Sequence, residues 1–341
     1  MYKPQNEALD MVLNMKYILG IDQGGSNTRA AVMDTSGEIL GYARTDGTYF
    51  PRDGMNVSLG IISKAVDDAL INAQLKIDDI CMIAIGITGI DYEGDDIYVQ
   101  NEFRQFFGVE EIHAFNDCVI AYYGGATDPF GAVICAGTGI NAAFFKPDNI
   151  WVMSDYMKAS IQGGSAIARR AIEAMFEAEV KVWPETKLRQ LFLELAGVDT
   201  VDEVLKMYIT DRDYGWRIIK LPPEILKLAL EGDFVSRMVL EQFSNDLCNC
   251  FIGGMKKMNM MEIDCTIVLA GSVYKGTDNY LRKVTTETLK KTAKNATIVN
   301  AAFEPVVGAC IMGVNKAAGK FDDQMRQRAI TSATKFGLDR V

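Results

Sequence analysis

The hydrophobic residues of this chain form two kinds of pattern. Short runs rich in Ile and Val, bounded by Gly, Asp or Asn, predict β-strands, whereas longer segments with apolar residues at helical spacing predict helices. The predicted strands cover residues 17–21, 29–33, 38–43, 81–87, 112–115, 132–135, 142–145, 266–269 and 297–299. The predicted helices cover residues 59–74, 167–179, 188–196, 234–258 and 321–336. Strands mixed with helices are typical of an α/β protein.

Two segments repeat the same order of elements. Residues 17–42 read as strand, DQGGSNT, strand, DTSGE, strand, and residues 131–153 read as strand, AGTGIN, strand, KPDN, strand. Any two hairpins share some likeness, so a chance similarity is one interpretation. The other is a duplicated fold with a cleft between its halves, which we favour because both first turns are polar and contain glycine.

The repeat predicts two lobes. We expect residues 1–124 together with 318–341 to form the first lobe, and residues 125–317 to form the second. The stretch between the second repeat and Thr266 reads almost wholly helical and predicts a helical insertion at about 165–262. The C-terminal amphipathic helix is expected to pack back on the first lobe.

Composition and charge narrow the class of protein. Of the 341 residues, 49% are hydrophobic, so each lobe can bury a core of ordinary size. The net charge of −10 argues against a nucleic-acid or anionic-membrane partner. No apolar run approaches the roughly 20 residues of a membrane span, and the polar residues 1–14 read as a peripheral extension rather than a secretory signal. We therefore expect a cytoplasmic protein, and a homodimer as its assembly.

The seven cysteines support the same compartment. Their number is odd and their spacing forms no CxxC framework, which favours small buried hydrophobic residues in a reducing cytoplasm. Cys248 and Cys250 form the one closely spaced pair, but no second pair follows and the chain has a single histidine. A metal or cluster site there is disfavoured.

The segment GIDQGGSNTRAAVMD, residues 20–34, places a polar loop between two apolar strands. Asp22 ends the first strand, at the edge where open α/β sheets collect ligands. Gly24 and Gly25 let a ligand approach the backbone, and consecutive amides in such a turn bind anions. Ser26 and Thr28 add hydroxyl groups. A glycine-rich hairpin without a ligand remains the alternative, because the loop has neither the Walker A nor the GxGxxG pattern.

The corresponding loop of the second repeat is CAGTGIN. Here Gly137 and Gly139 flank the hydroxyl of Thr138 directly after a predicted strand. The loop therefore offers amide donors and one rotatable O–H group to a phosphate oxygen. Paired with the loop at residues 22–28, it predicts two turns that clamp the same polyphosphate.

Asn116 and Asp117 lie between a predicted strand and a helix. Both residue types are favoured at helix N-termini, so helix capping alone explains them. In a phosphate-binding cleft, a carboxylate at a strand end could instead take the proton of a substrate hydroxyl. The sequence leaves both interpretations open.

Two further segments contain small residues at strand or helix ends. Gly271 and Ser272 follow a predicted strand, where small residues let a flat ring lie against the backbone. Gly163 and Gly164 open a predicted helix, whose N-terminus attracts anions and hydroxyl groups. A flexible turn with an N-cap explains the second segment equally well. Gly308, inside an apolar helix, is expected to allow a close helix contact.

The order of these motifs is more specific than any one of them. DQGGSNT at 22–28, GTG at 137–139 and LAGS at 269–272 resemble the first phosphate, second phosphate and adenosine motifs of the sugar kinase/Hsp70/actin superfamily. The resemblance is closer to the BadF/BadG/BcrA/BcrD ATPase family and, within it, to N-acetylglucosamine kinases. It implies an α/β fold of two ribonuclease H-like, actin-like ATPase domains with a central cleft and a helical insertion in the second. It also implies ATP and Mg²⁺ as cofactors.

The resemblance implies a role for each residue of the motifs. Asp117 would be the general base that activates a sugar hydroxyl, and Asp22 would orient Mg²⁺ through water. The residues implied to bind ATP are Gly24, Gly25, Ser26, Thr28, Gly137, Thr138, Gly139, Gly271 and Ser272. The residues implied to surround the sugar are Thr88, Gly89, Asn116, Asn141, Gln162, Gly163 and Gly164.

One segment departs from the pattern of acetylglucosamine kinases. Those enzymes usually carry GDEGS where this chain reads Ile161 to Ser165, IQGGS, so that Gln162 stands in place of an acidic sugar ligand. A neutral amide binds a hydroxyl less strongly than a carboxylate does. N-acetylglucosamine, glucosamine, N-acetylmuramic acid or another sugar therefore remains open. The alternatives are an ATPase activator of a dehydratase or reductase from the same family, which would need a cysteine-bound cluster, and a sugar sensor without catalysis.

Overall fold

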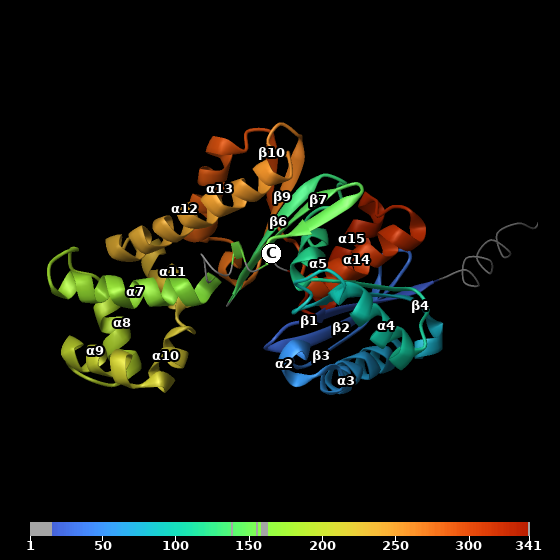
Figure 1. Cartoon of the computed structure of the whole chain (residues 1–341), viewed down its shortest axis with the longest axis horizontal. Coiled ribbons are helices and arrows are strands. Elements are labelled where there is room, and N and C mark those ends of the chain that lie inside the picture. The colour runs from blue at the N-terminus through green and yellow to red at the C-terminus, as the bar shows by residue number, and fades with distance from the viewer. Residues whose placement is uncertain (1–15, 138, 155, 158–162, 340–341) are drawn as a thin grey trace, which may run out of the picture. The chain divides into compact units, whose positions relative to one another are not determined.

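The computed structural model describes residues 16–137, 139–154, 156–157 and 163–339 (Figure 1). The chain divides into two compact units. The first contains the residues up to Thr127 and those from Ala301 onward, and the second is Asp128–Asn300. Each unit is built on its own mixed β-sheet.

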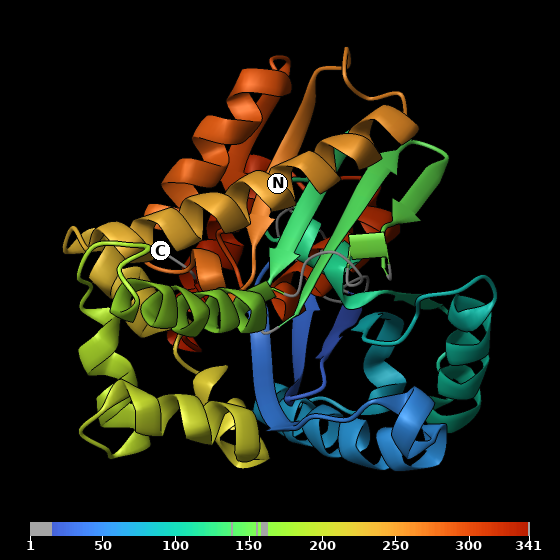
Figure 2. The ribbon, with the colours of Figure 1, turned by 60° about the vertical axis from the view of Figure 1, so that its left-hand side comes forward.

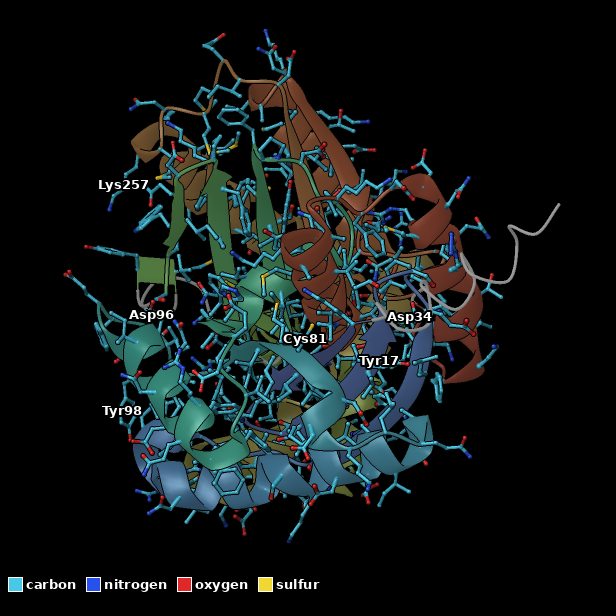
Figure 3. The ribbon with its side chains drawn as sticks, turned by 90° about the vertical axis from the view of Figure 1, so that its right-hand side faces the viewer. Tyr17, Asp34, Cys81, Asp96, Tyr98 and Lys257 are labelled. Carbon is cyan, nitrogen blue, oxygen red and sulfur yellow. The ribbon has the colours of Figure 1, made fainter. Side chains whose placement is uncertain are left out.

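The first unit contains the first repeat. Its sheet has the order β3-β2-β1-β4-β5, in which β1–β3 are antiparallel and β4 and β5 run parallel to β1. These strands are β1 (Tyr17–Gln23), β2 (Asn27–Asp34), β3 (Ile39–Asp46), β4 (Ile80–Ile87) and β5 (Ile112–Phe115). Figure 3 shows Tyr17 and Asp34 near one another, at the end of the β1–β2 hairpin opposite to its glycine-rich turn.

Helices cover both faces of this sheet because its strands are apolar on both sides. Leu19 and Ile21 pack with α3 (Met55–Ala73), whereas Ile18 packs on the other face against α14 (Pro305–Ala318). The C-terminal α15 (Asp323–Lys335) joins that second face, as expected, and Ser332 Oγ accepts a hydrogen bond from the Ile39 amide. The remaining helices are α2 (Phe50–Asp53), η1 (Ile77–Asp79), α4 (Asp95–Phe107) and α5 (Asp117–Tyr123).

The second unit repeats the topology of the first. Its sheet has the order β10-β9-β6-β7-β8, with β6–β8 antiparallel and β9 and β10 parallel to β6. Read from β8 inward, this order matches that of the first sheet strand for strand, so the predicted duplication is confirmed. The strands are β6 (Gly131–Ala136), β7 (Ile140–Lys146), β8 (Asn149–Val152), β9 (Cys265–Ala270) and β10 (Ala296–Asn300).

Helices fill the second unit between β8 and β9. Figure 2 shows the long α12 and α13 side by side along the sheet, and α8, α9 and α10 grouped beyond α7. These helices share one hydrophobic core with the inner residues of β6 and β7. The helices between β8 and β9 are α7 (Gly163–Glu179), α8 (Leu188–Ala196), α9 (Val201–Thr210), α10 (Arg212–Ile218), α11 (Pro222–Leu230) and α12 (Phe234–Lys257). Between β9 and β10 lie η2 (Ser272–Tyr274) and α13 (Tyr280–Thr292).

One boundary of the predicted lobes is wrong. The sequence placed residues up to 317 in the second lobe, but the chain returns to the first unit at Ala301. The reason is α14, whose Val306 and Val307 bury their side chains with Ile18 and Met33 of the first sheet. Residues 1–14, expected to be peripheral, lie outside the described residues. Among the described helices, none is long and apolar enough to cross a membrane.

Candidate functional site

Asp22 lies near the carboxyl end of β1, as the sequence predicted, and is paired with an arginine. Arg29 is its direct cross-strand partner on β2, and Arg29 Nη1 lies 2.8 Å from Asp22 Oδ2. Burial alone would lower the pKa of Arg29, but the carboxylates of Asp22 and Glu304 outweigh it and raise that pKa. Asp22 itself is only 7% exposed, so the ion pair fixes its carboxylate at the strand end.

The turn between β1 and β2 is braced from behind by the chain that follows β3. Gln23 Nε2 donates to the carbonyl oxygens of both Gly24 and Thr48, and the Thr48 amide donates to Gly24 O over 3.3 Å. A Cβ on Gly47 would lie within 2.5 Å of the Ser26 backbone, so the two segments pack backbone to backbone. Sequence reasoning missed this brace, because nothing in the sequence marks Gly47 or Thr48.

Two polar atoms at this turn have no partner. Gln23 Oε1 and Thr28 Oγ1 are buried without a hydrogen bond to any described residue. The two residues are cross-strand neighbours at the mouth of the turn. A buried hydroxyl or amide oxygen without a hydrogen bond destabilises the folded protein, so folded proteins rarely keep one. Two such atoms at a predicted ligand loop are therefore candidates for hydrogen bonds to a ligand. Thr28 fits the predicted role of a hydroxyl reserved for a phosphate oxygen.

The glycines of this turn are not explained by the fold. Neither Gly24 nor Gly25 has a positive φ, and a Cβ on Gly25 would meet no described atom within 4 Å. At Gly24 the nearest atom would be Asn27 O at 3.6 Å, which is ordinary contact. Neither backbone conformation nor packing against the described residues requires glycine here, so the turn leaves its backbone open on the side where the sequence predicts a ligand.

The strands β4 and β5 bring Asp117 to the same edge of the sheet. Asp22 pairs with Gly86 of β4, and Gly86 pairs with Phe115 of β5, two residues before Asp117. A Cβ on Gly86 would lie 3.1 Å from the Asp117 Cα. Asp22 and Asp117 therefore both neighbour Gly86, whose missing side chain leaves room for Ile120 and for the start of α5.

Asn116 is used by the fold. It is the N-cap of α5: its Oδ1 accepts from the Cys118 amide over 3.1 Å. Its Nδ2 donates to Ile90 O at 3.0 Å and to Asp91 Oδ1 at 3.1 Å. With 3% of its surface exposed, Asn116 ties the loop after β4 to the start of α5. The capping interpretation is confirmed, and Asp91, which sequence reasoning gave no role, is brought beside the predicted base.

The predicted sugar residues Thr88 and Gly89 belong to the same loop. The Thr88 amide donates to Gln23 O over 3.0 Å, which joins this loop to the end of β1. Gly89 has φ +102°, and a Cβ there would lie 2.8 Å from the Pro51 ring. Gly89 is thus required by the fold itself, in contrast to Gly25.

In the second unit, three segments converge on the glycines of the second loop. The Gly137 amide donates to Gly139 O, and the Gly164 amide donates to Gly137 O, both over 2.8 Å. A Cβ on Gly163 would lie 2.2 Å from Gly139 O, and one on Gly271 would lie 2.0 Å from Ala136 O. The N-terminus of α7 and the β9–η2 turn therefore both pack on this loop.

Gly137 and Gly139 themselves repeat the pattern of the first turn. Among the described residues, nothing would lie within 4 Å of a Cβ on Gly139, and only Ser272 Oγ, at 3.7 Å, near one on Gly137. Asn141, expected near a sugar, uses its Oδ1 to accept from the Ala142 and Ser154 amides over 2.8 and 2.9 Å. Thr138 and Gln162 lie outside the described residues.

The residues present suit a hydrated Mg²⁺ ion rather than a metal held by protein alone. Within the described part of the chain no group of three metal-ligating side chains occurs. Mg²⁺ needs little more than one carboxylate when a polyphosphate supplies its other ligands, and Asp22 offers that carboxylate. The cysteines are free thiols, and burial raises the pKa of Cys248 to about 12, which disfavours a thiolate ligand.

Comparisons with known proteins give relatives that match most of this chain. The chain is 22% identical over 324 residues to an N-acetyl-D-glucosamine kinase of Dictyostelium discoideum, covering 89% of this chain and 99% of that protein. It is 26% identical over 240 residues to the glucosamine kinase GspK of Vibrio cholerae, covering 68% and 78%. A solved structure of a candidate N-acetylglucosamine kinase from Chromobacterium violaceum matches with a TM-score of 0.65 at 17% identity, covering 87% of this chain and 99% of that one.

The structural match shows the two-domain α/β fold shared with sugar kinases, as the motifs predicted. A family model gives the narrower relationship, because residues 19–313 match it from β1 to α14. That range includes both glycine loops and the carboxylate edge of the first sheet. The chain therefore belongs to the BadF/BadG/BcrA/BcrD ATPase family.

Proposed function

We propose that this protein is a kinase that transfers the γ-phosphoryl group of ATP to a hydroxyl of an amino sugar or related sugar. N-acetylglucosamine, glucosamine and N-acetylmuramic acid are the class we have in mind. The observation that carries the proposal is the placement of Asp22 and Asp117 next to Gly86 at one sheet edge. The names of the relatives, both kinases of amino sugars, support the substrate class.

Asp117 is the general base of this proposal. A carboxylate within hydrogen-bond reach of a sugar hydroxyl takes its proton as the oxygen attacks phosphorus. The N-cap bonds of Asn116 fix the backbone that precedes this carboxylate. The proposed sugar surface in the first unit consists of Asn116 and of Thr88 and Gly89, which lie on the loop that Asn116 holds in place. In the second unit it consists of Asn141, Gln162, Gly163 and Gly164.

The glycine turns hold the donor. The amides of Gly24 and Gly25, with the hydroxyls of Ser26 and Thr28, are proposed to bind phosphate oxygens, and Gly137 to Gly139 to do the same from the second unit. Asp22 would hold Mg²⁺ through water, and that ion, when bound, neutralises charge on the phosphates. Gly271 and Ser272 are proposed to flank the adenosine. Little covalent chemistry is asked of the protein, since positioning and charge neutralisation dominate phosphoryl transfer.

The cellular setting is part of the proposal. We expect a cytoplasmic homodimer that binds no nucleic acid, which the net charge of −10 and the free cysteines support. The two lobes are proposed to act as one ATPase-type module, with the helices between β8 and β9 as an insertion.

The experiment is ADP release with a panel of amino sugars, run beside Asp117→Asn and Asp68→Asn. Asp68 is an exposed carboxylate on α3 and serves as the matched control. At least one sugar should raise ADP release well above background, and Asp117→Asn should lower kcat by about a hundredfold or more. ADP release that no sugar increases would contradict the kinase and favour a sugar-independent ATPase. Full activity in Asp117→Asn would contradict the base alone.

A further inference from the structure

A cavity in the second unit has no role in the function proposed above. It measures about 610 Å³ and lies between α7, α9 and α10. That volume is within the range of small-molecule sites in proteins. Its walls include Arg169 of α7, Tyr208 of α9, and Arg212 and Trp216 of α10.

Both arginines of this cavity lack an ion pair among the described residues. Neither Arg169 nor Arg212 forms an ion pair or a hydrogen bond with any residue that the structure describes. Arg170, the next residue on α7, is different: it donates to Gln242 over 2.9 Å and pairs with Glu173 at 3.6 Å. Both side chains are exposed, so their guanidinium groups are open to a ligand in the cavity.

The cavity also offers a flat aromatic face. Trp216 is 69% exposed, and its indole N–H has no described partner. Exposed tryptophan is costly to leave in water and is suited to stacking on a planar ring. The hydroxyl groups of Ser165 and Tyr208 in the lining can either donate or accept a hydrogen bond. The other polar side chains of the lining, two guanidinium groups and one indole, can only donate. No Asp, Glu, Asn or Gln belongs to the described lining.

The cavity begins next to the second glycine loop. Ser165, in its wall, directly follows Gly164, whose amide donates to Gly137 O. A Cβ on Gly164 would lie 3.4 Å from Val273, which follows Ser272. Arg169 is five residues further along α7, about 7.5 Å at the helical rise. A nucleotide with its phosphates at Gly137 has room for its ribose before its base reaches Arg169.

We propose that this cavity holds the base of the phosphoryl donor and accepts purines with a 6-oxo group, guanine and hypoxanthine, at least as well as adenine. The inference rests on the proposed function. Arginine donates to O6 and N7 of guanine, whereas adenine presents an acceptor beside a donor. Backbone N–H and C=O groups inside a helix are hydrogen-bonded within that helix. The side chains of the lining therefore determine which purine base the cavity prefers. Trp216 stacks on any purine.

The test compares ATP, GTP and ITP as donors at saturating sugar. We expect kcat/KM for GTP and ITP to equal or exceed that for ATP. Arg169→Gln should lower kcat/KM for GTP and ITP by about tenfold relative to ATP, the lower range for loss of a bidentate arginine contact. Arg170→Gln, the matched control, should leave all three values unchanged. Trp216→Ala should weaken every donor by about tenfold, with rescue by Trp216→Phe.

Calorimetry with ADP and GDP, in the absence of sugar, separates this inference from the proposed function. Binding of GDP at least as tight as that of ADP, weakened by Arg169→Gln, supports the cavity even if no sugar is phosphorylated. A sugar kinase that prefers ATP a hundredfold, with Arg169→Gln without effect on any donor, overturns the inference and leaves the proposed function standing. If neither nucleotide binds, both fail.

Discussion

The backbone of Asp117 packs directly against Gly86. A Cβ at Gly86 would come within 3.1 Å of the Asp117 Cα and within 2.5 Å of the Ile120 side chain. Because Gly86 is also the β-sheet partner of Asp22, the backbones of both aspartates are neighbours of this one residue.

We predict that Gly86→Ala damages both stability and activity. The added methyl group must displace the Ile120 side chain and press on the backbone at Asp117, at a cost of about 1–3 kcal/mol for an overpacked core. Since α5 begins with Asp117, kcat should fall further than the loss of folded protein explains. Urea unfolding and kinetics measure the two effects. Gly60→Ala is the control: it lies on α3 with open space at its Cβ, and should stabilise the protein by about 0.5–1 kcal/mol.

We predict contrasting effects of alanine on the stability of the protein at Gly25 in the β1–β2 turn and at Gly47, which packs against that turn. Gly25→Ala meets open space, so the free energy of unfolding should change by less than about 0.5 kcal/mol, while KM for the nucleotide rises because the methyl group blocks close approach. Gly47→Ala meets the backbone of the same turn within 2.5 Å and should destabilise the protein. Thermal unfolding with nucleotide titration checks both. Gly25→Ala with an unchanged nucleotide KM would contradict the role of that turn.

The hydrogen bonds of Gln23 predict that its loss affects KM for the nucleotide but not KM for the sugar. Gln23→Leu removes the side-chain donor to Gly24 O and Thr48 O, while keeping an apolar side chain in the buried position. We expect KM for the nucleotide to rise severalfold and KM for the sugar to change little. Gln190→Leu, at an exposed site on α8, is the control. A rise confined to the sugar KM would show that the brace positions a different loop.

A feature of the fold or of the site could be predicted from the sequence when it depends on residues that are close together in the chain. The strands of both repeats and the Asn116 cap follow from patterns of a few neighbouring residues, and they are confirmed. Helix α4 was missed because only Val99 and Phe103 are buried in it, so its apolar period is faint. The placement of α14 was wrong because its burial extends over most of its surface, and such a pattern does not say which sheet covers it. The Gly47 brace depends on a contact between separate loops, which no local pattern records.

His113, the one histidine of the chain, gives a pH prediction. Burial, with help from the charge of Lys316, lowers its pKa below the ordinary 6.5, and the nearby Glu111 only partly opposes this. As pH falls through about 6.5, the unfolded chain therefore takes up the proton first. The free energy of unfolding should fall from pH 6.5 downward until the folded pKa is reached, and this contribution should be constant above 6.5.

Proton NMR of the single imidazole measures this pKa directly. Lys316→Gln should raise it and Glu111→Gln should lower it, while Lys320→Gln, which is paired with Asp322, serves as the control. A midpoint above 6.5 in the folded protein would contradict the dominance of burial.

The close contact of α14 with α5 gives a final prediction. A Cβ on Gly308 would lie 2.1 Å from Ile120 O, within the helix contact that the sequence led us to expect. Gly308→Ala should therefore lower the thermal unfolding midpoint, because the two helices cannot separate without exposing the core residues around Ile120 and Ala309. Gly253→Ala, on α12 with open space at its Cβ and no positive φ, is the control and should leave the midpoint unchanged or slightly raised.

The return of the chain to its first sheet has a consequence for synthesis on the ribosome. Ile18 and Met33 emerge early, but Val306 and Val307, which cover them, are made only after the whole of Asp128–Asn300. One apolar face of the first sheet therefore stays uncovered while the second unit is translated, and the second unit can fold during that time. Nascent chains stalled before residue 305 should expose that face, and the released full-length chain should not.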